Sequence, residues 1–123
     1  MDNTKFLEPK EIEIDGAKFI ISKMPAIQAQ QAYGAIMREC KDEGDIGMTY
    51  LSEQTVVDIL KYAALKDEDS VEVLEDIDKI NFACPNVSML IKLEAAMIRY
   101  NFGFLFNGTL PKVLETLRSQ EGI

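Results

Sequence analysis

Histidine is missing from this sequence of 123 residues. Histidine is the usual general base for a serine or cysteine nucleophile and the commonest zinc ligand, so its absence removes most nucleophilic hydrolase mechanisms and most zinc sites. The phosphate-binding patterns GxxxxGK[ST] and GxGxxG are missing as well. We therefore predict no catalytic residues, no cofactor and no metal, and an enzyme is the less favoured class.

Cysteine is scarce, with Cys40 and Cys84 as the two thiols and no CxxC spacing. The first residues, MDNTKFLEPKEIE, are polar and acidic, unlike a secretory signal. Free thiols in the cytoplasm are the favoured interpretation, although the sequence leaves a disulfide between them open. Cys84 precedes an expected helix start, a position that can lower a thiol pKa, but a small buried residue is the favoured interpretation.

Basic residues are in deficit, because 13 lysines and arginines face 21 acidic residues and the net charge is −8. Nucleic acids and anionic membranes are bound through clusters of lysine and arginine, so neither is an expected partner. Long uninterrupted apolar runs are also missing. The most apolar stretch carries Lys92, Glu94 and Arg99, which is typical of a core helix and not of a membrane span.

What the chain does have is the composition of one globular domain, with 47% apolar and 28% charged residues. A chain of this length can bury a core without a disulfide or a metal. We expect a flexible lead-in over 1–9 and a single α+β domain over 10–123. In that domain a hairpin over 10–22 packs on a helical body over 25–120.

The hairpin prediction depends on Asp15-Gly16, a favoured pair for a two-residue type I′ turn. That turn pairs Ile14 with Ala17, Glu13 with Lys18 and Ile12 with Phe19. Two strands alone are marginal in water, so the hairpin must lie on helices or gain a further strand. Its apolar face consists of Ile12, Ile14, Ala17, Phe19 and Ile21. Its polar face consists of Glu11, Glu13, Lys18 and Ile20, with a Glu13–Lys18 charge pair.

About five helices are expected from apolar residues at helical spacing. Ser52 and Asn86 are the predicted N-caps of the second and the fourth. The fourth, apolar over most of its circumference, is expected to be central and to end at Gly103. The predicted ranges are 25–40, 53–65, 69–80, about 87–102, and a short last helix that includes 110–117.

The acidic loop that runs from Asp42 to Glu53 is better explained as a solvated turn than as a calcium site. With Asp42 as the first residue of an EF-hand loop ending at Glu53, the third and fifth ligands would be Gly44 and Ile46, which supply no side-chain oxygen. The segment KDEDS at 66–70 is interpreted as a solvated helix start.

Glu94 is expected on the apolar side of the fourth helix, opposite a polar stripe of Ser88, Lys92 and Arg99. A buried carboxylate needs a partner or a raised pKa. The favoured interpretation is an acid at the edge of the core paired with a lysine or arginine, or one at the surface of an interface. The alternative interpretation is that the Glu94 carboxylate contacts a partner and sets the specificity of binding.

Four aromatic residues cluster where the fourth helix is expected to break. Most should close the core, but at least one is expected to line a groove because the chain leaves the helix at Gly103. The predicted partner-binding residues are Ile20 of the hairpin together with Tyr100, Phe102, Phe104 and Phe106.

Three features together resemble the tail assembly chaperones of long-tailed bacteriophages and their prophage relatives. They are the hairpin EIEIDGAKFIISKMPA leading into a helix, the small acidic and otherwise helical body, and the ending YNFGFLFNGTLPKVLETLRSQ. The resemblance implies a non-enzymatic protein that binds and solubilises the tape measure protein and aids polymerisation of tail tube subunits. It also implies action in the host cytoplasm and absence from the finished virion.

The hairpin edge is expected to offer pairing to such a partner or to a second copy of the chain. A small acidic immunity or inhibitor protein, which blocks a toxin or nuclease by binding, is the first alternative. A small enzyme is the second.

Overall fold

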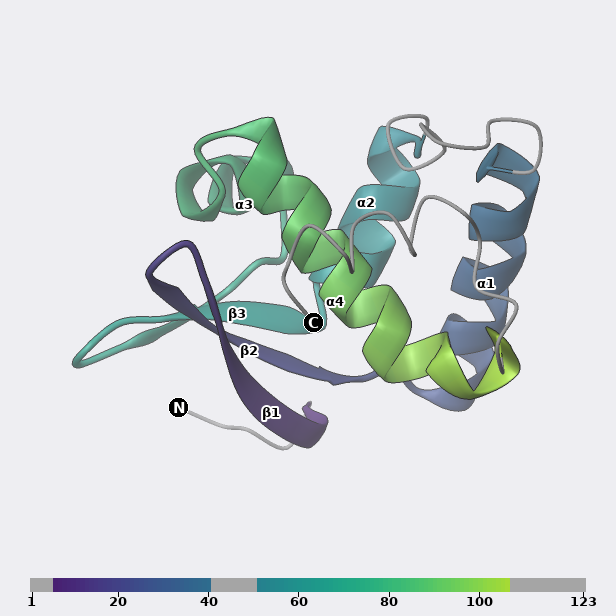
Figure 1. The fold of residues 1–123 in the computed structure, drawn as a ribbon, viewed down its shortest axis with the longest axis horizontal. Coiled ribbons are helices and arrows are strands. Elements are labelled where there is room, and N and C mark those ends of the chain that lie inside the picture. Colours follow the sequence, from purple (N-terminus) through teal and green to yellow (C-terminus); the bar gives the residue numbers. More distant parts are fainter. Residues whose placement is uncertain (1–5, 41–50, 107–123) are drawn as a thin grey trace.

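The computed structural model describes residues 6–40 and 51–106, and these form one sheet and a set of helices (Figure 1). This confirms an α+β fold with an N-terminal hairpin. The described elements, in chain order, are β1 (Leu7–Ile14), β2 (Ala17–Lys23), α1 (Ala26–Cys40), α2 (Glu53–Leu60), β3 (Ala63–Lys66), β4 (Val71–Val73), α3 (Ile77–Ala83) and α4 (Val87–Phe106).

The hairpin of β1 and β2 has the predicted register, with Ile14 opposite Ala17 and Ile12 opposite Phe19. Asp15 and Gly16 both have positive φ, 50° and 87°, as a type I′ turn requires. Glu13 and Lys18 are register partners. The ion pair found on this face within the described residues, however, joins Glu11 to Lys66 of β3 at 2.8 Å.

The sheet has two strands more than the hairpin, in the order β1-β2-β3-β4, and all neighbours are antiparallel. The predicted helix 53–65 therefore stops at Leu60, and Ala63–Lys66 pairs with β2 instead. Alanine is the best helix former, but helix propensities differ by less than about 1 kcal/mol per residue, and the hydrogen bonds offered by the edge of β2 outweigh this local preference. The hairpin thus gains the neighbouring strand that its stability requires.

The prediction of a helix over 69–80 is also wrong in its first half, because Val71–Val73 pairs with β3. The segment 66–70 is exposed, as expected, but it is a strand-to-strand turn in which the Asp67 amide donates to the Ser70 carbonyl at 2.8 Å. The helix α3 starts later, where the Asp76 carboxylate accepts from the Lys79 amide at 2.9 Å.

The two predicted N-caps are confirmed. The Ser52 hydroxyl accepts from the Thr55 amide at 3.2 Å, and the Asn86 side chain accepts from the Met89 amide at 2.9 Å. Each satisfies an amide that has no partner inside its helix.

The helix α4 continues through Gly103 to Phe106, so its predicted end is wrong. A glycine inside a helix costs about 1 kcal/mol, which the packing of a long buried helix can outweigh. Four helices therefore lie within the described residues, where five were expected for the whole chain. The predicted helix around 110–117 and most of the loop 42–53 lie outside the described residues.

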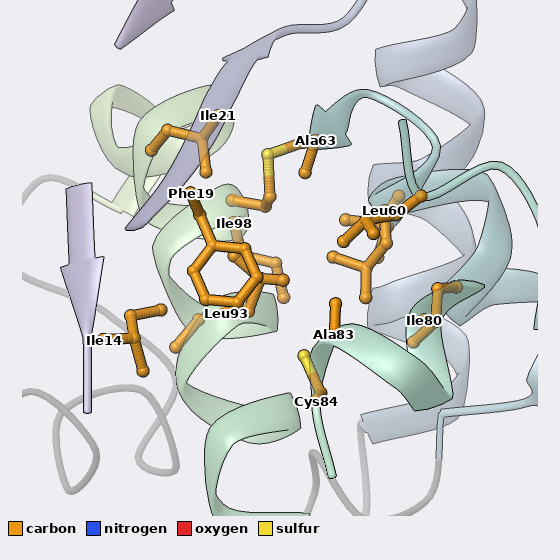
Figure 2. Close-up of a cluster of buried hydrophobic side chains, with 14 of the residues drawn as sticks. Ile14, Phe19, Ile21, Leu60, Ala63, Ile80, Ala83, Cys84, Leu93 and Ile98 are labelled. Atoms are coloured by element: carbon orange, nitrogen blue, oxygen red, sulfur yellow. The ribbon is translucent and has the colours of Figure 1, made fainter. Parts of the chain in front are cut away.

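The core lies between the sheet and the helices, with α4 at its centre as predicted. Figure 1 shows α4 running between the strands and the pair α1 and α2. Phe19 of β2 points toward Leu93 and Ile98 of α4, and Leu60 and Ile80 close the opposite side (Figure 2).

The end of β2 is fixed on α4 by Asn101, a residue that is 7% exposed. Its Oδ1 accepts from the Met24 amide at 2.8 Å, and its Nδ2 donates to the carbonyls of Ser22 and Met97 at 3.1 and 3.0 Å. These three bonds give every polar atom of the buried Asn101 side chain a partner. They hold the end of β2 in one position against α4.

The first strand begins before the predicted hairpin. Residues from Leu7 onward belong to β1, and Phe6 is buried, so 6–9 are not a loose lead-in. The ladder is irregular between Leu7 and Lys10, and Glu8 has a φ of 47°. The Tyr100 hydroxyl donates to the Glu8 carbonyl at 2.6 Å and thereby ties this irregular start to α4.

Candidate binding groove

A groove of about 550 Å³ lies between β1 and α4. This volume is in the range of binding sites for small molecules or for several side chains of a peptide. Its walls come from the hairpin, mostly from its apolar face, and from one side of α4, and Glu13 of the polar face is also among them. They consist of Lys10, Ile12, Glu13, Ile14, Asp15, Ile21, Lys92, Ala96, Arg99 and Tyr100.

Two side-chain links to β1 bound the groove. At the hairpin turn, Lys92 Nζ lies 3.0 Å from Asp15 Oδ1. At the start of β1, the Tyr100 hydroxyl donates to the Glu8 carbonyl. Lys92 and Tyr100 are eight residues apart in one helix, which corresponds to about 12 Å at 1.5 Å per residue. About four residues of extended chain, at 3.4 Å each, cover this length.

The floor of the groove is apolar and its mouth is charged. Ile12 and Ala96 are partly buried, and Ile14 and Ile21 belong to the core cluster. Lys10, at the mouth, lies 5.6 Å from the centre of the Tyr100 ring, and Lys23 lies 4.3 Å from the same ring. Cations over an aromatic face are attracted to it, so Tyr100 holds the Lys10 amine at one end of the groove. The Lys23 amine does not line the groove and also donates to the Tyr100 carbonyl.

Of the predicted partner-binding residues, Tyr100 lies in the groove and Ile20 does not. Ile20 is partly buried on the opposite face of the sheet, between Glu11 and Ala64. Phe102 is 3% exposed and its ring lies 5.5 Å from that of Tyr33, so it is part of the core. Phe104 and Phe106 lie in the last turn of α4, with side chains outside the described part of the structure.

Most groove residues were not among the predicted ones. The signals were present separately, as the apolar hairpin face with Ile12 and as the stripe with Lys92 and Arg99 on α4. Nothing in either pattern shows that one faces the other. Asp15 and Lys92 are 77 positions apart, and only the crossing of α4 over the hairpin brings them together.

Glu94 lies on the apolar side of α4, as predicted, and is 2% exposed. Burial raises the pKa of its carboxyl to about 8. The salt bridges within residues 6–40 and 51–106 involve other carboxylates, so the favoured pairing with a lysine or arginine is not found there. Glu94 is a desolvated acid and does not line the groove.

Cys84 is a buried thiol at the end of α3, which confirms the favoured interpretation. Burial raises its pKa to about 11, and the charge of Glu94 adds to this rise. Such a thiol is protonated at neutral pH and is a poor nucleophile. The idea that a helix start lowers its pKa is therefore wrong. The side chain of Cys40 lies outside the described residues.

In the described part of the chain, no helix is long and apolar enough to cross a membrane. The same residues contain no group of three or more cysteine, aspartate or glutamate side chains that could hold a metal ion. Comparison with models of protein families, with curated proteins and with solved structures found no match for this chain.

Proposed function

We propose that the protein is a non-enzymatic assembly chaperone that binds an extended, partly apolar segment of a larger protein. The observation that supports this most is the groove between β1 and α4, whose apolar floor runs beside the edge strand of the sheet. Apolar contact in such a groove contributes roughly 25 cal/mol per Å² before the costs of association are subtracted.

The proposed partners are the tape measure protein and the tail tube subunits of a long-tailed phage. This part of the proposal follows from the resemblance in the hairpin, the acidic body and the C-terminal segment. The protein would act in the host bacterial cytoplasm and be absent from the finished virion. Its net charge of −8 would keep a complex with an aggregation-prone partner in solution.

The buried ionisable groups support binding over catalysis. Cys84 has a raised pKa, which disfavours the thiolate that a nucleophile needs. Glu94 is enclosed in the core, away from the groove residues, where a substrate has no access. Affinity should come mainly from apolar contact, so added salt should weaken binding only modestly.

Co-expression tests this function. The protein is produced together with the proposed tape measure partner, and the soluble fraction of that partner is measured. We expect the wild-type chain to raise the soluble fraction and to co-purify with the partner. Ala96→Phe, which fills the groove, should abolish both effects, whereas Glu68→Lys, in the exposed turn between β3 and β4, should not.

Circular dichroism and thermal unfolding must first show that both variants are folded. If the wild-type chain neither binds nor solubilises the tape measure partner, the chaperone proposal is wrong and the inhibitor alternative becomes the better one. If folded Ala96→Phe works as well as wild type, the groove is not the binding site.

A further inference from the structure

We infer that the partner segment joins the sheet as an additional strand on the free edge of β1, with apolar residues over the groove alternating with basic residues beside Glu11 and Glu13. This inference rests on the proposed function for the existence of a protein partner, but not for its identity. It specifies which backbone groups bind and what sequence pattern they select.

The free backbone groups follow from the hairpin register. In a two-residue turn the flanking pair, Ile14 and Ala17, is hydrogen-bonded, and hydrogen-bonded and non-bonded pairs then alternate along the ladder. Ile12 and Lys10 therefore bond to β2, opposite Phe19 and Ile21. The amides and carbonyls of Glu11 and Glu13 point the other way, to the side of β1 that has no neighbour in the described sheet.

The usable edge is short. Pro9 has the same orientation as Glu11 but carries no N–H, and the ladder is irregular between Leu7 and Lys10. At the other end the chain turns at Asp15. An added strand can therefore exchange full pairs of hydrogen bonds only with Glu11 and Glu13. This agrees with a groove about four extended residues long.

The two faces of β1 select different side chains on the added strand. Residues opposite Lys10, Ile12 and Ile14 lie on the groove side, over its apolar floor. Residues opposite Glu11 and Glu13 lie on the other side. Glu11 already has Lys66 at 2.8 Å, whereas Glu13 forms no salt bridge within the described residues. A lysine or arginine of the added strand opposite Glu13 would give this carboxylate the cation that Glu11 already has in Lys66.

A second copy of the chain is a poorer occupant of the same edge. In antiparallel registers of two β1 strands that use the outward groups, Glu11 or Glu13 of one copy lies opposite Glu11 or Glu13 of the other. Like charges directly opposite each other destabilise a strand pair. A heterologous segment with alternating apolar and basic residues avoids this repulsion and fills the groove.

Synthetic peptides test the inference without any assumption about the natural partner. The probe is acetyl-Gly-Val-Lys-Val-Lys-Val-Gly-amide, with the two lysines intended to lie opposite Glu11 and Glu13. One control has the same composition with the lysines adjacent. A second is the probe with both lysine amides N-methylated, which removes the N–H groups that pair with β1. Binding to the full ¹⁵N-labelled chain is followed by amide shifts and hydrogen exchange.

We expect the Glu11 and Glu13 amides to exchange freely in the unbound chain. With the probe at ten times its Kd, their exchange should slow by about tenfold, while the Ile12 amide should be protected in both states. Glu13→Lys should weaken binding by about three- to tenfold. Glu13→Pro, which removes an outward N–H and leaves the bonds to β2, should weaken it further, and Glu68→Lys should have no effect.

Four results would overturn the inference. The first is that the probe does not bind at millimolar concentration, and the second is that the N-methylated control binds equally well. The third is that amide changes are confined to the exposed Phe82 of α3 and Val87 of α4. The fourth is that the Glu11 and Glu13 amides are already protected before the probe is added. In the last case sedimentation shows whether a second copy or the chain itself covers the edge. If the probe binds but co-expression fails, the chaperone function is wrong and the edge-pairing inference stands.

Discussion

Replacement of Glu94 by glutamine should make the protein more stable, and increasingly so as the pH rises. Glu94 is 2% exposed within α4, and burial raises the pKa of its carboxyl from 4.5 to about 8. Glutamine has nearly the same shape and carries no charge at any pH. The variant Glu94→Gln therefore removes one titration from the core and leaves the packing nearly unchanged.

The direction of the pH effect on stability follows from which state of the chain keeps the Glu94 proton. Between pH 4.5 and pH 8 the folded chain keeps the Glu94 proton and the unfolded chain releases it, so rising pH favours unfolding of the wild type. The full difference between the two pKa values corresponds to about 5 kcal/mol at 1.36 kcal/mol per pH unit. Between pH 5 and pH 8, the stability advantage of Glu94→Gln over wild type should grow by roughly 3–4 kcal/mol.

Urea denaturation at pH 5, 6, 7 and 8, followed by circular dichroism, measures this difference. Glu68→Gln, which changes an exposed carboxylate, is the matched control and should stay within about 0.5 kcal/mol of wild type at every pH. If the gap between Glu94→Gln and wild type does not change with pH, Glu94 is ionised in the folded chain and paired with a cation. The account of Glu94 as an unpaired core acid would then be wrong.

Three further perturbations probe the fold that positions the groove. Asn101→Ala should lower the free energy of unfolding in urea by about 2–3 kcal/mol, because the Met24 amide loses its buried acceptor. Phe19→Ala should cost about 3–5 kcal/mol in the same assay, because the ring is fully buried against α4. Thermal unfolding with and without a chelator should coincide, and a midpoint loss of several degrees on chelation would overturn the interpretation of the loop 42–53 as a solvated turn.

Local signals made the hairpin and the helix caps predictable. Asp15-Gly16 determines both the turn and the register, so the facing of Ile12 and Phe19 followed from neighbouring residues alone. The same holds for Ser52 and Asn86, which bond to amides three positions away. In each case the interaction that specifies the structure lies within a few residues of the sequence pattern.

The third and fourth strands could not be predicted in this way. Ala63–Lys66 has no strand pattern of its own and becomes a strand because β2 lies beside it, with Phe19 opposite Leu65. Similarly, Gly103 weakens a helix locally, but α4 is held by contacts with distant elements such as that between Phe102 and Tyr33. Tertiary pairing outweighs a local preference in both places.

The sequence predicted the two walls of the groove but not that they face each other. The polar stripe with Lys92 and Arg99 and the apolar face of the hairpin were both recognised, but their facing depends on how α4 crosses the sheet. The aromatic cluster was more misleading, because rotation by 100° per residue sends Tyr100 to the groove and Phe102 to the core. Both residues lie inside the predicted helix 87–102, so the helix period separates their directions, but which of them faces the groove depends on how α4 packs against the sheet.

Hydrogen exchange of the complex with the natural partner tests most directly whether the free edge of β1 is the binding surface. The co-purified complex and the free chain are compared by mass spectrometry with residue-level fragmentation. We expect new protection at the amides of Glu11 and Glu13 and none at Phe82 or Val87. Protection at Phe82 and Val87 with unchanged exchange at Glu11 and Glu13 would show that the partner binds elsewhere and that the groove beside β1 is not the functional site.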